Sequence, residues 1–209
     1  MFQALNATST TLVDYLQASI DGDPFFGTPG HPWRDRNMHV RLQTPAEMLD
    51  NNGEEGVSFW LYRVVRDEER VNDPARRISP TQLRPPPLPV RLHYLVTPIT
   101  NRVNAGDPDT EQYALGKVMQ LFHSKPKFRG ADLRGQFAGT AGQLYVRLET
   151  LSLDEITRVW EGLNGSYQLS ISYEVTCVDI DAALEPQSIT PVVVSLPEIG
   201  IASLVMEAS

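Results

Sequence analysis

Side chains that could perform acid–base, nucleophilic or metal chemistry are few and scattered in this sequence of 209 residues. The four histidines have no metal-ligand spacing, and Cys177, the single cysteine, has no second thiol with which to bind a metal or form a disulfide. Ser166 follows an expected helix end instead of a sharp strand-to-helix turn, so it lacks the setting of a nucleophile. Asp179 and Asp181 could share one strand face and serve in acid–base work, but aspartates at a strand end usually face water. We therefore predict no catalytic residue, no metal ligand and no cofactor site, and we expect that the chain is not an enzyme.

The overall charge and hydropathy exclude further classes of function. A formal net charge of -8 disfavours general nucleic-acid binding, because neutralising phosphates requires a positive surface. No glycine-rich phosphate-binding loop follows an expected strand. No stretch approaches the roughly 20 apolar residues that span a bilayer, and residues 1–20 form an amphipathic segment unlike an export signal. The sequence thus predicts a soluble, folded chain with no nucleic-acid partner, no membrane span and no visible export signal.

The elements that must position any site follow from hydrophobic periodicity and from capping residues. Ser152 and Glu155 have the spacing of a capping box, and Trp160 falls on the apolar stripe of the helix that follows, where a core position is expected. Another apolar stripe consists of Leu115, Val118, Met119 and Phe122. Helices are expected at 5–20, 107–124 and 152–163, with a short one starting at residue 44; strands are expected at 37–42, 57–65, 90–97, 143–151 and 168–181. This order predicts an α+β (α/β) fold, in which helices pack on a small mixed β-sheet.

The stretch RPPPLPVRLHYLVTPIT, residues 84–100, places prolines before a run that alternates as a half-buried strand. One face of the strand is apolar and consists of Val90, Leu92, Tyr94 and Val96. The other carries Arg91, His93, Leu95 and Thr97, and His93 is expected to be a surface or interface residue. Proline cannot donate a hydrogen bond to a β-ladder, so the prolines are expected to fix an extended lead-in and to confine pairing to the later part. They are Pro85, Pro86, Pro87 and Pro89.

Two further segments set the domain organisation. Residues 66–87 are charged and proline-rich, which suits a long exposed excursion of one domain because too little chain precedes them for an independent core. The apolar end of the chain is cut by Pro191 and Pro197 and is too short to fold alone. We therefore predict one domain over residues 1–182 and a C-terminal arm over residues 183–209, which packs either on its own domain or on a neighbour.

Three stretches together resemble the cap, or tail-terminator, proteins of extracellular contractile injection systems, which are phage-tail-like particles. They are RPPPLPVRLHYLVTPIT, then EQYALGKVMQLFHSKP, then LSLDEITRVWEGLNGSYQLSISYEVTCVDID, in that order. The likeness is strongest over residues 84–181. No single stretch would suffice, but the order of the prolines, the LHYLVT strand and the Trp160 helix is fairly specific.

The resemblance implies a fold similar to phage tail terminators and a structural role. Proteins of that family are implied to form a homo-oligomeric ring, a hexamer, on the last ring of the inner tube protein and to touch the end of the sheath protein. Such a subunit would assemble in the cytoplasm and lie at the distal end of the particle. The alternatives are a non-catalytic adaptor that binds another particle or envelope component through residues 66–87, and an enzyme of unknown reaction, which the lack of a clustered catalytic set opposes. The candidate interface residues are Arg84, Pro85, Pro86, Pro87, Arg91, His93, Val192, Val194, Ile199, Ile201 and Leu204.

Overall fold

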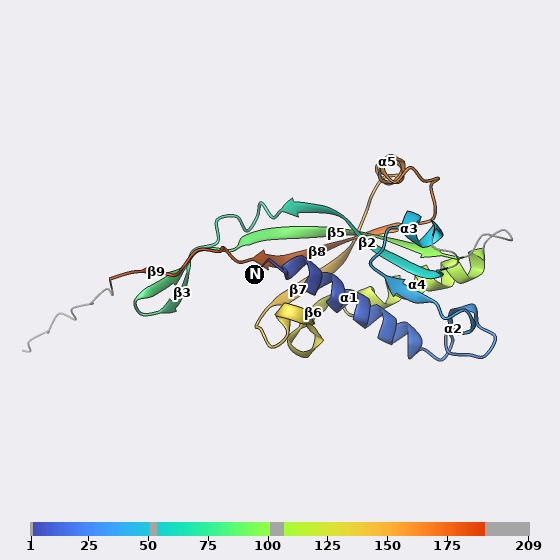
Figure 1. Cartoon of the computed structure of the whole chain (residues 1–209), viewed down its shortest axis with the longest axis horizontal. Coiled ribbons are helices and arrows are strands. Elements are labelled where there is room, and N and C mark those ends of the chain that lie inside the picture. The colour runs from blue at the N-terminus through green and yellow to red at the C-terminus, as the bar shows by residue number, and fades with distance from the viewer. Residues whose placement is uncertain (1, 51–53, 101–106, 191–209) are drawn as a thin grey trace, which may run out of the picture.

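The computed structural model describes residues 2–50, 54–100 and 107–190. It has an elongated form, with a body of helices and a large sheet and a thin extension of strands that projects from one end (Figure 1). The helices are α1 (Ala4–Asp21), α2 (Pro32–Asp35), α3 (Pro45–Asp50), α4 (Pro108–Ser124) and α5 (Leu153–Gly162). The strands are β1 (His39–Arg41), β2 (Gly56–Arg66), β3 (Arg76–Ser79), β4 (Gln82–Arg84), β5 (Leu88–Ile99), β6 (Lys127–Arg129), β7 (Gln143–Glu149), β8 (Ile171–Ile180) and β9 (Gln187–Ser188).

The large sheet has the strand order β1-β2-β5-β8-β7-β6. The pair β1 and β2 is parallel, and the other neighbours are antiparallel. The predicted mixed sheet with helices packed on it is therefore confirmed. The long central strands β2, β5 and β8 are the three whose sequences concentrate β-branched and aromatic residues.

The inner face of this sheet packs on α1 and α4, which lie together below it in Figure 1. Tyr94 of β5 is fully buried there, stacks on Phe59 with ring centroids 4.6 Å apart, and shares a hydrogen bond of 2.8 Å with Ser9 of α1. The predicted apolar face of β5 belongs to this core. Met119, expected on the apolar stripe of α4, is instead 39% exposed, and Ala114 is buried in the stripe.

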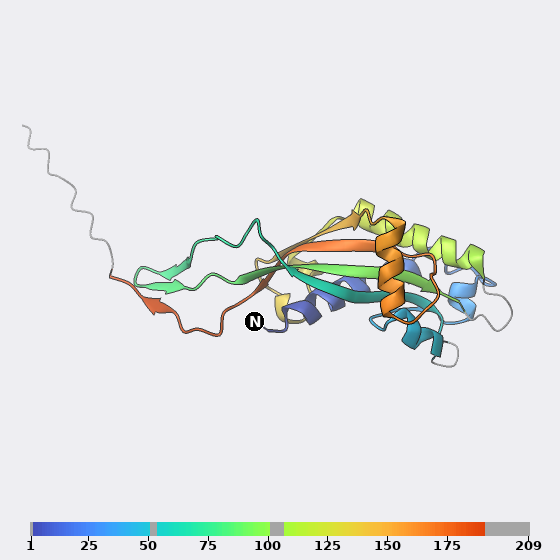
Figure 2. The ribbon, with the colours of Figure 1, turned by 90° about the horizontal axis from the view of Figure 1, so that it is seen from above.

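On the outer face, α5 crosses the strands in Figure 2, and the short α3 also packs on β2 and β5. Trp160 of α5 is 1% exposed and packs with Leu95 of β5 and Ile156, so the predicted core role of Trp160 is confirmed. The predicted capping box is also present, since the Ser152 hydroxyl accepts from the N–H of Glu155 and the Glu155 carboxylate accepts from the N–H of Ser152. Beside α5, the outer face carries the buried polar side chains of His93, Ser172 and Glu174.

Two β-bulges break the strict period of two. Tyr62 is the extra residue of β2, because the register passes from the pair Leu61 and Tyr94 to the pair Arg63 and His93. On β8 the two residues Thr176 and Cys177 oppose Arg91 alone, and Cys177 takes a positive φ of 65°. Cys177 therefore does not continue the period of two from Tyr173 and Val175, and Val178 is the buried residue. Bulges re-aim side chains, and these two lie on either side of His93.

A second sheet, with the order β3-β4-β9, forms the projecting extension. We call residues 67–87 and 181–190 together the arm. The prediction placed no strand between residues 66 and 87, whereas β3 and β4 form a hairpin there around Pro80 and Thr81. Pro85, Pro86 and Pro87 separate β4 from β5, so they divide the two sheets. Pro89 differs from the expectation, because it lies inside β5 opposite Asp179.

The chain between α4 and β7 also holds structure that was not expected. Strand β6 pairs with β7, and two 3-10 turns, Gly130–Asp132 and Gly135–Phe137, follow it. Gly130, Gly135 and Gly139 have positive φ, which is why glycine suits these turns. No described helix is long and apolar enough to cross a membrane.

Candidate assembly surfaces

The arm is the first candidate surface, because it is a sheet with almost no core of its own. β4 pairs with β3 on one side and, at Gln82 and Leu83, with β9 on the other. The N–H of Ile189 donates to the carbonyl of Thr81 at 2.8 Å and extends this pairing. Isolated two- or three-stranded sheets without a packed apolar face are marginal in water. The arm therefore needs a further surface to become rigid.

Apolar side chains along the arm and its base are exposed in the single chain. Ile78 of β3 is 42% exposed, Leu88 at the start of β5 is 47% exposed, and Leu184 before β9 is 66% exposed. Scattered exposed apolar residues are ordinary on a thick domain. On a thin extension they have no neighbouring core to join, so burial against another chain is the remaining way to remove them from water.

Ion pairs fix the root of the arm to the body. Asp67 is 3% exposed and accepts a hydrogen bond of 2.7 Å from Arg91 of β5, while its own N–H donates to the carbonyl of Pro89. Arg70 donates to both carboxylate oxygens of Asp179, at 2.8 and 3.2 Å. A guanidinium that binds a carboxylate with two parallel bonds sets direction as well as energy. The arm therefore leaves the body in a defined direction.

We expect Asp67→Asn to lower the free energy of unfolding at pH 7 by about 2 kcal/mol, somewhat less than for a fully buried pair, because Arg91 keeps Glu69 at 3.2 Å. The hydrogen bond from Arg91 holds the pKa of Asp67 below its ordinary value of 3.8. The stabilisation is therefore present above that value and is lost as the pH falls through the lower folded pKa. Denaturant unfolding of the parent and the variant at pH 7 and at low pH measures this, and the difference should shrink in acid. Glu68→Gln, at an exposed neighbouring position, is the control; equal losses for both variants would contradict the clamp.

The second candidate surface is a polar cluster on the outer face, beside α5. The carboxylate of Glu149 accepts from Ser172 at 2.7 Å and lies 3.1 Å from Nδ1 of His93. The Tyr62 hydroxyl, placed by its bulge, lies 3.1 Å from the Ser172 hydroxyl. Burial acts to raise the pKa of Glu149, but the hydrogen bonds from Ser172 and His93 outweigh it and hold the pKa below its ordinary value. Burial raises the pKa of Tyr62.

Glu174 connects this cluster to cations. It is 6% exposed, lies 2.9 Å from Arg147 and 4.0 Å from Arg91, and stands opposite His93 in the sheet. One atom each of His93, Glu149 and Glu174 lies within 4.8 Å of the others, and such donors can bind a divalent cation. In this geometry, however, the carboxylate of Glu174 is already paired with Arg147. The carboxylate of Glu149 already has His93 and Ser172 as partners. The arrangement is an ion-pair and hydrogen-bond network that connects β5, β7 and β8.

The structure places the candidate interface residues in three different settings. Arg84 ends β4 and is exposed, and Pro85, Pro86 and Pro87 follow it along the arm, half-buried or exposed. Arg91 is paired at the root of the arm, and His93 is not a surface residue of the single chain, since it is 4% exposed. The remaining candidates lie outside the described residues; they are Val192, Val194, Ile199, Ile201 and Leu204.

Several residues of both surfaces escaped the sequence analysis. Asp67, Glu149 and Glu174 stand at ordinary positions for charged residues, and nothing in their spacing indicates that the sheet brings them to Arg91 and His93. The hairpin of the arm did leave a signal. Pro80 occupies the first central position of the two-residue turn, where proline is favoured.

The described residues form a mixed-sheet body that carries a strand arm. A sequence model of the Pvc16 N-terminal domain matches residues 7–194. The chain belongs to the Pvc16 N-terminal domain family, which confirms the resemblance noted in the sequence. No curated protein sequence matches the chain.

Two solved structures share the fold along the whole chain. One is a cryo-EM structure of the PVC sheath/tube terminator of an extracellular contractile injection system in the extended state, with 20% identity, a TM-score of 0.60 and 64% of that protein covered. The other is the cryo-EM structure of the anti-feeding prophage tube-terminating cap, with 18% identity, a TM-score of 0.59 and 61% covered. Both comparisons cover 100% of this chain. The chain thus spans less than two thirds of the length of each of these proteins.

Proposed function

We propose that this chain is the structural cap, or tail terminator, of a contractile injection system. It forms a ring on the last layer of the inner tube and contacts the end of the sheath, so that assembly stops there. Membership of the Pvc16 N-terminal domain family supports this proposal. The observation that supports it most is that the whole chain, arm included, has the fold of proteins described as tube and sheath terminators.

The physical logic of a terminator agrees with the two surfaces. A tube grows because each ring offers one face and accepts another, and growth continues until a subunit binds that does not reproduce the acceptor face. The arm offers apolar residues and unpaired strand edges to a neighbour. The prolines between the two sheets keep the ladder of the arm separate from the ladder of the body, in line with the use of proline to protect sheet edges. Such a subunit binds one ring of the tube on one face and offers no binding face for a further ring.

A homo-oligomeric ring follows as part of the proposal, with six subunits as the expected number. An obligate ring needs lateral interfaces on the order of 2,000 Å² or more. We propose that the arm, together with the rest of the C-terminal segment up to residue 209, supplies the interface area outside the body. The role is non-catalytic, with cytoplasmic assembly and a final position at the distal end of the particle. The domain division at residue 182 gives the C-terminal segment its own part in assembly.

We expect that a strain lacking this chain makes tubes of uncontrolled length, or few intact particles, because no subunit closes the growing end. Electron micrographs of purified particles give the length distribution, and the full chain supplied in trans should restore a single narrow length. Tubes and sheaths of normal length in the deletion strain would count against the cap. Normal tubes that lack one other particle component would favour the adaptor instead.

A further inference from the structure

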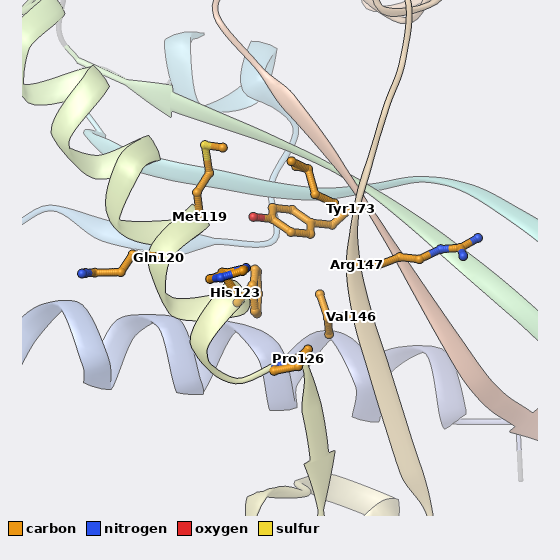
Figure 3. A pocket seen from close by; sticks show the side chains of 9 residues that line it. Met119, Gln120, His123, Pro126, Val146, Arg147 and Tyr173 are labelled. Atoms are coloured by element: carbon orange, nitrogen blue, oxygen red, sulfur yellow. The ribbon is translucent and has the colours of Figure 1, made fainter.

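An apolar groove lies between the C-terminal half of α4 and the inner face of β7 and β8. Its volume is about 630 Å³, and Met119, Phe122, Val146, Leu148 and Tyr173 supply most of its lining. Figure 3 shows these elements around the groove, with Met119 on the helix and Val146 and Tyr173 on the strands. Met119 is 39% exposed and Leu148 is 48% exposed, so the groove is open to an occupant. The volume is within the usual range of roughly 300–1,000 Å³ for binding pockets.

An unpaired strand edge runs along the same groove. β6 pairs with β7 as far as Tyr145, and the N–H of Val146 donates to the carbonyl of Pro126 at 2.8 Å. Beyond Val146, no described strand pairs with β7 on that side. Because a strand repeats every two residues, the N–H and C=O of Leu148 point to the same open side as those of Val146. The groove therefore suits an extended segment that adds as a strand and places alternate side chains against α4.

The C-terminal segment of the chain has the composition for this role. Val192–Leu196 reads Val-Val-Val-Ser-Leu between two prolines, which is a short β-prone apolar segment. Residues 191–209 contain Glu198 and Glu207 but no lysine or arginine. The apolar side chains of this segment match the mostly apolar lining of the groove.

The position where the described chain ends decides between its own groove and that of a neighbour. Thr190 follows β9 at the far end of the arm, whereas α4 lies in the body, and both ribbon views agree on this separation. The four residues from Thr190 to Val194 span at most about 14 Å. The arm of one subunit must therefore reach the body of another before the segment can enter the groove.

We propose that residues 192–196 of one subunit add as a strand to the open edge of β7 at Leu148 in a second copy of this chain, with their apolar side chains in the groove beside Met119. The inference rests on the proposed function for the ring in which the two copies meet. It assigns the donor segment and the acceptor site of one subunit contact.

Mixed-chain disulfide formation tests the contact directly. In a Cys177→Ser background, full-length chains with Leu148→Cys are mixed with size-tagged chains with Val194→Cys under mild oxidation. The expected result is a covalent dimer of one tagged and one untagged chain. Leu153→Cys on α5, at a position 69% exposed on the opposite face, is the matched acceptor control and should give little product. Equal yields with both acceptors, or no mixed dimer, would overturn the proposal.

Self-association of full-length chains gives a second readout that does not depend on a disulfide. Leu148→Glu and truncation after Thr190 should each weaken association at least tenfold in light-scattering titrations, and Leu153→Glu should leave it unchanged. If Leu148→Glu associates as strongly as the parent chain, the groove contact is ruled out, but the proposed ring is not affected. If the parent chain stays monomeric at all concentrations, both the ring and the groove contact are ruled out. Loss of tube-length control by Leu148→Glu with normal association would mean that another particle protein occupies the groove, which also overturns the second-copy contact.

Discussion

Replacing Gly56 with alanine is expected to lower the free energy of unfolding by about 4 kcal/mol, among the largest effects of a single methyl group. Gly56 begins β2 with a φ of +144°, a conformation that side chains rarely adopt. A Cβ at this position would lie 1.9 Å from the carbonyl oxygen of His39 and 2.7 Å from its nitrogen. Both atoms belong to the backbone of β1, so no side-chain rotation relieves the clash.

The clash at residue 56 would also displace β1, because β1 pairs in parallel with β2 at Gly56. Moving β1 away would expose Val40 and Met38, which are 5% and 2% exposed. It would also strain the hydrogen bond of 2.7 Å from the N–H of Val40 to the side chain of Gln17 on α1. The alanine therefore lowers the free energy of unfolding in two ways: by backbone strain of about 1–3 kcal/mol and by the loss of packing at the edge of the sheet.

Gly116→Ala is the matched control in the same chain. Gly116 lies inside α4, and a Cβ there meets nothing within 4 Å. The same methyl group should stabilise this helix by about 0.5–1 kcal/mol, since glycine is the poorer helix former. Chemical denaturation of both variants measures the contrast. A Gly56→Ala chain within 1 kcal/mol of the parent would show that β1 does not approach Gly56 closely.

The body of this protein was largely predictable because its signals are local. The helix start at Ser152 depends on side chains that bond to backbone groups three residues away, and the predicted capping box is present. The apolar face of β5 follows from the period of a strand, and all four of its residues join the core. Local chemistry of this kind survives in any tertiary setting.

The bulges and the arm were not predictable from the same reasoning. A strict period of two carries no signal for the extra residue at Tyr62 or for the turn of the backbone at Cys177, and both are set by pairing with β5. Strands β3 and β4 lack the apolar alternation of a half-buried strand because the arm has no core. The short β9 pairs with β4 across about a hundred residues of sequence, a contact that no local pattern encodes.

The assembly residues divide in the same way. The prolines beside Arg84 could be found because a run of prolines is conspicuous in any sequence. The clamp of Asp67 on Arg91 and the network around His93 depend on which strands become neighbours, and the sequence order alone leaves that open. Surfaces made from several strands are thus visible only once the register is known.

The double change of Ile78 and Leu184 to glutamate is expected to abolish ring formation while the chain stays folded. Both side chains are exposed in the single chain, 42% and 66%, so folding should change by no more than about 0.5 kcal/mol per site. In the ring, each substitution removes roughly 2 kcal/mol of stabilisation from apolar burial, and it adds the unfavourable desolvation of a charge. A total near 4 kcal/mol weakens association on the order of a thousandfold.

Leu169 and Leu153 allow a control of matched exposure, because they are 46% and 69% exposed and lie just before β8 and on α5, away from the arm. Their double change to glutamate adds the same charge and removes a similar apolar area, so net repulsion alone would affect both variants equally. Light scattering should find the arm variant monomeric and the control associated as the parent is. In the deletion strain, only the control should restore a single tube length. If both variants assemble, the exposed apolar residues of the arm do not meet a neighbour, and the lateral contact of the ring must lie elsewhere on the body.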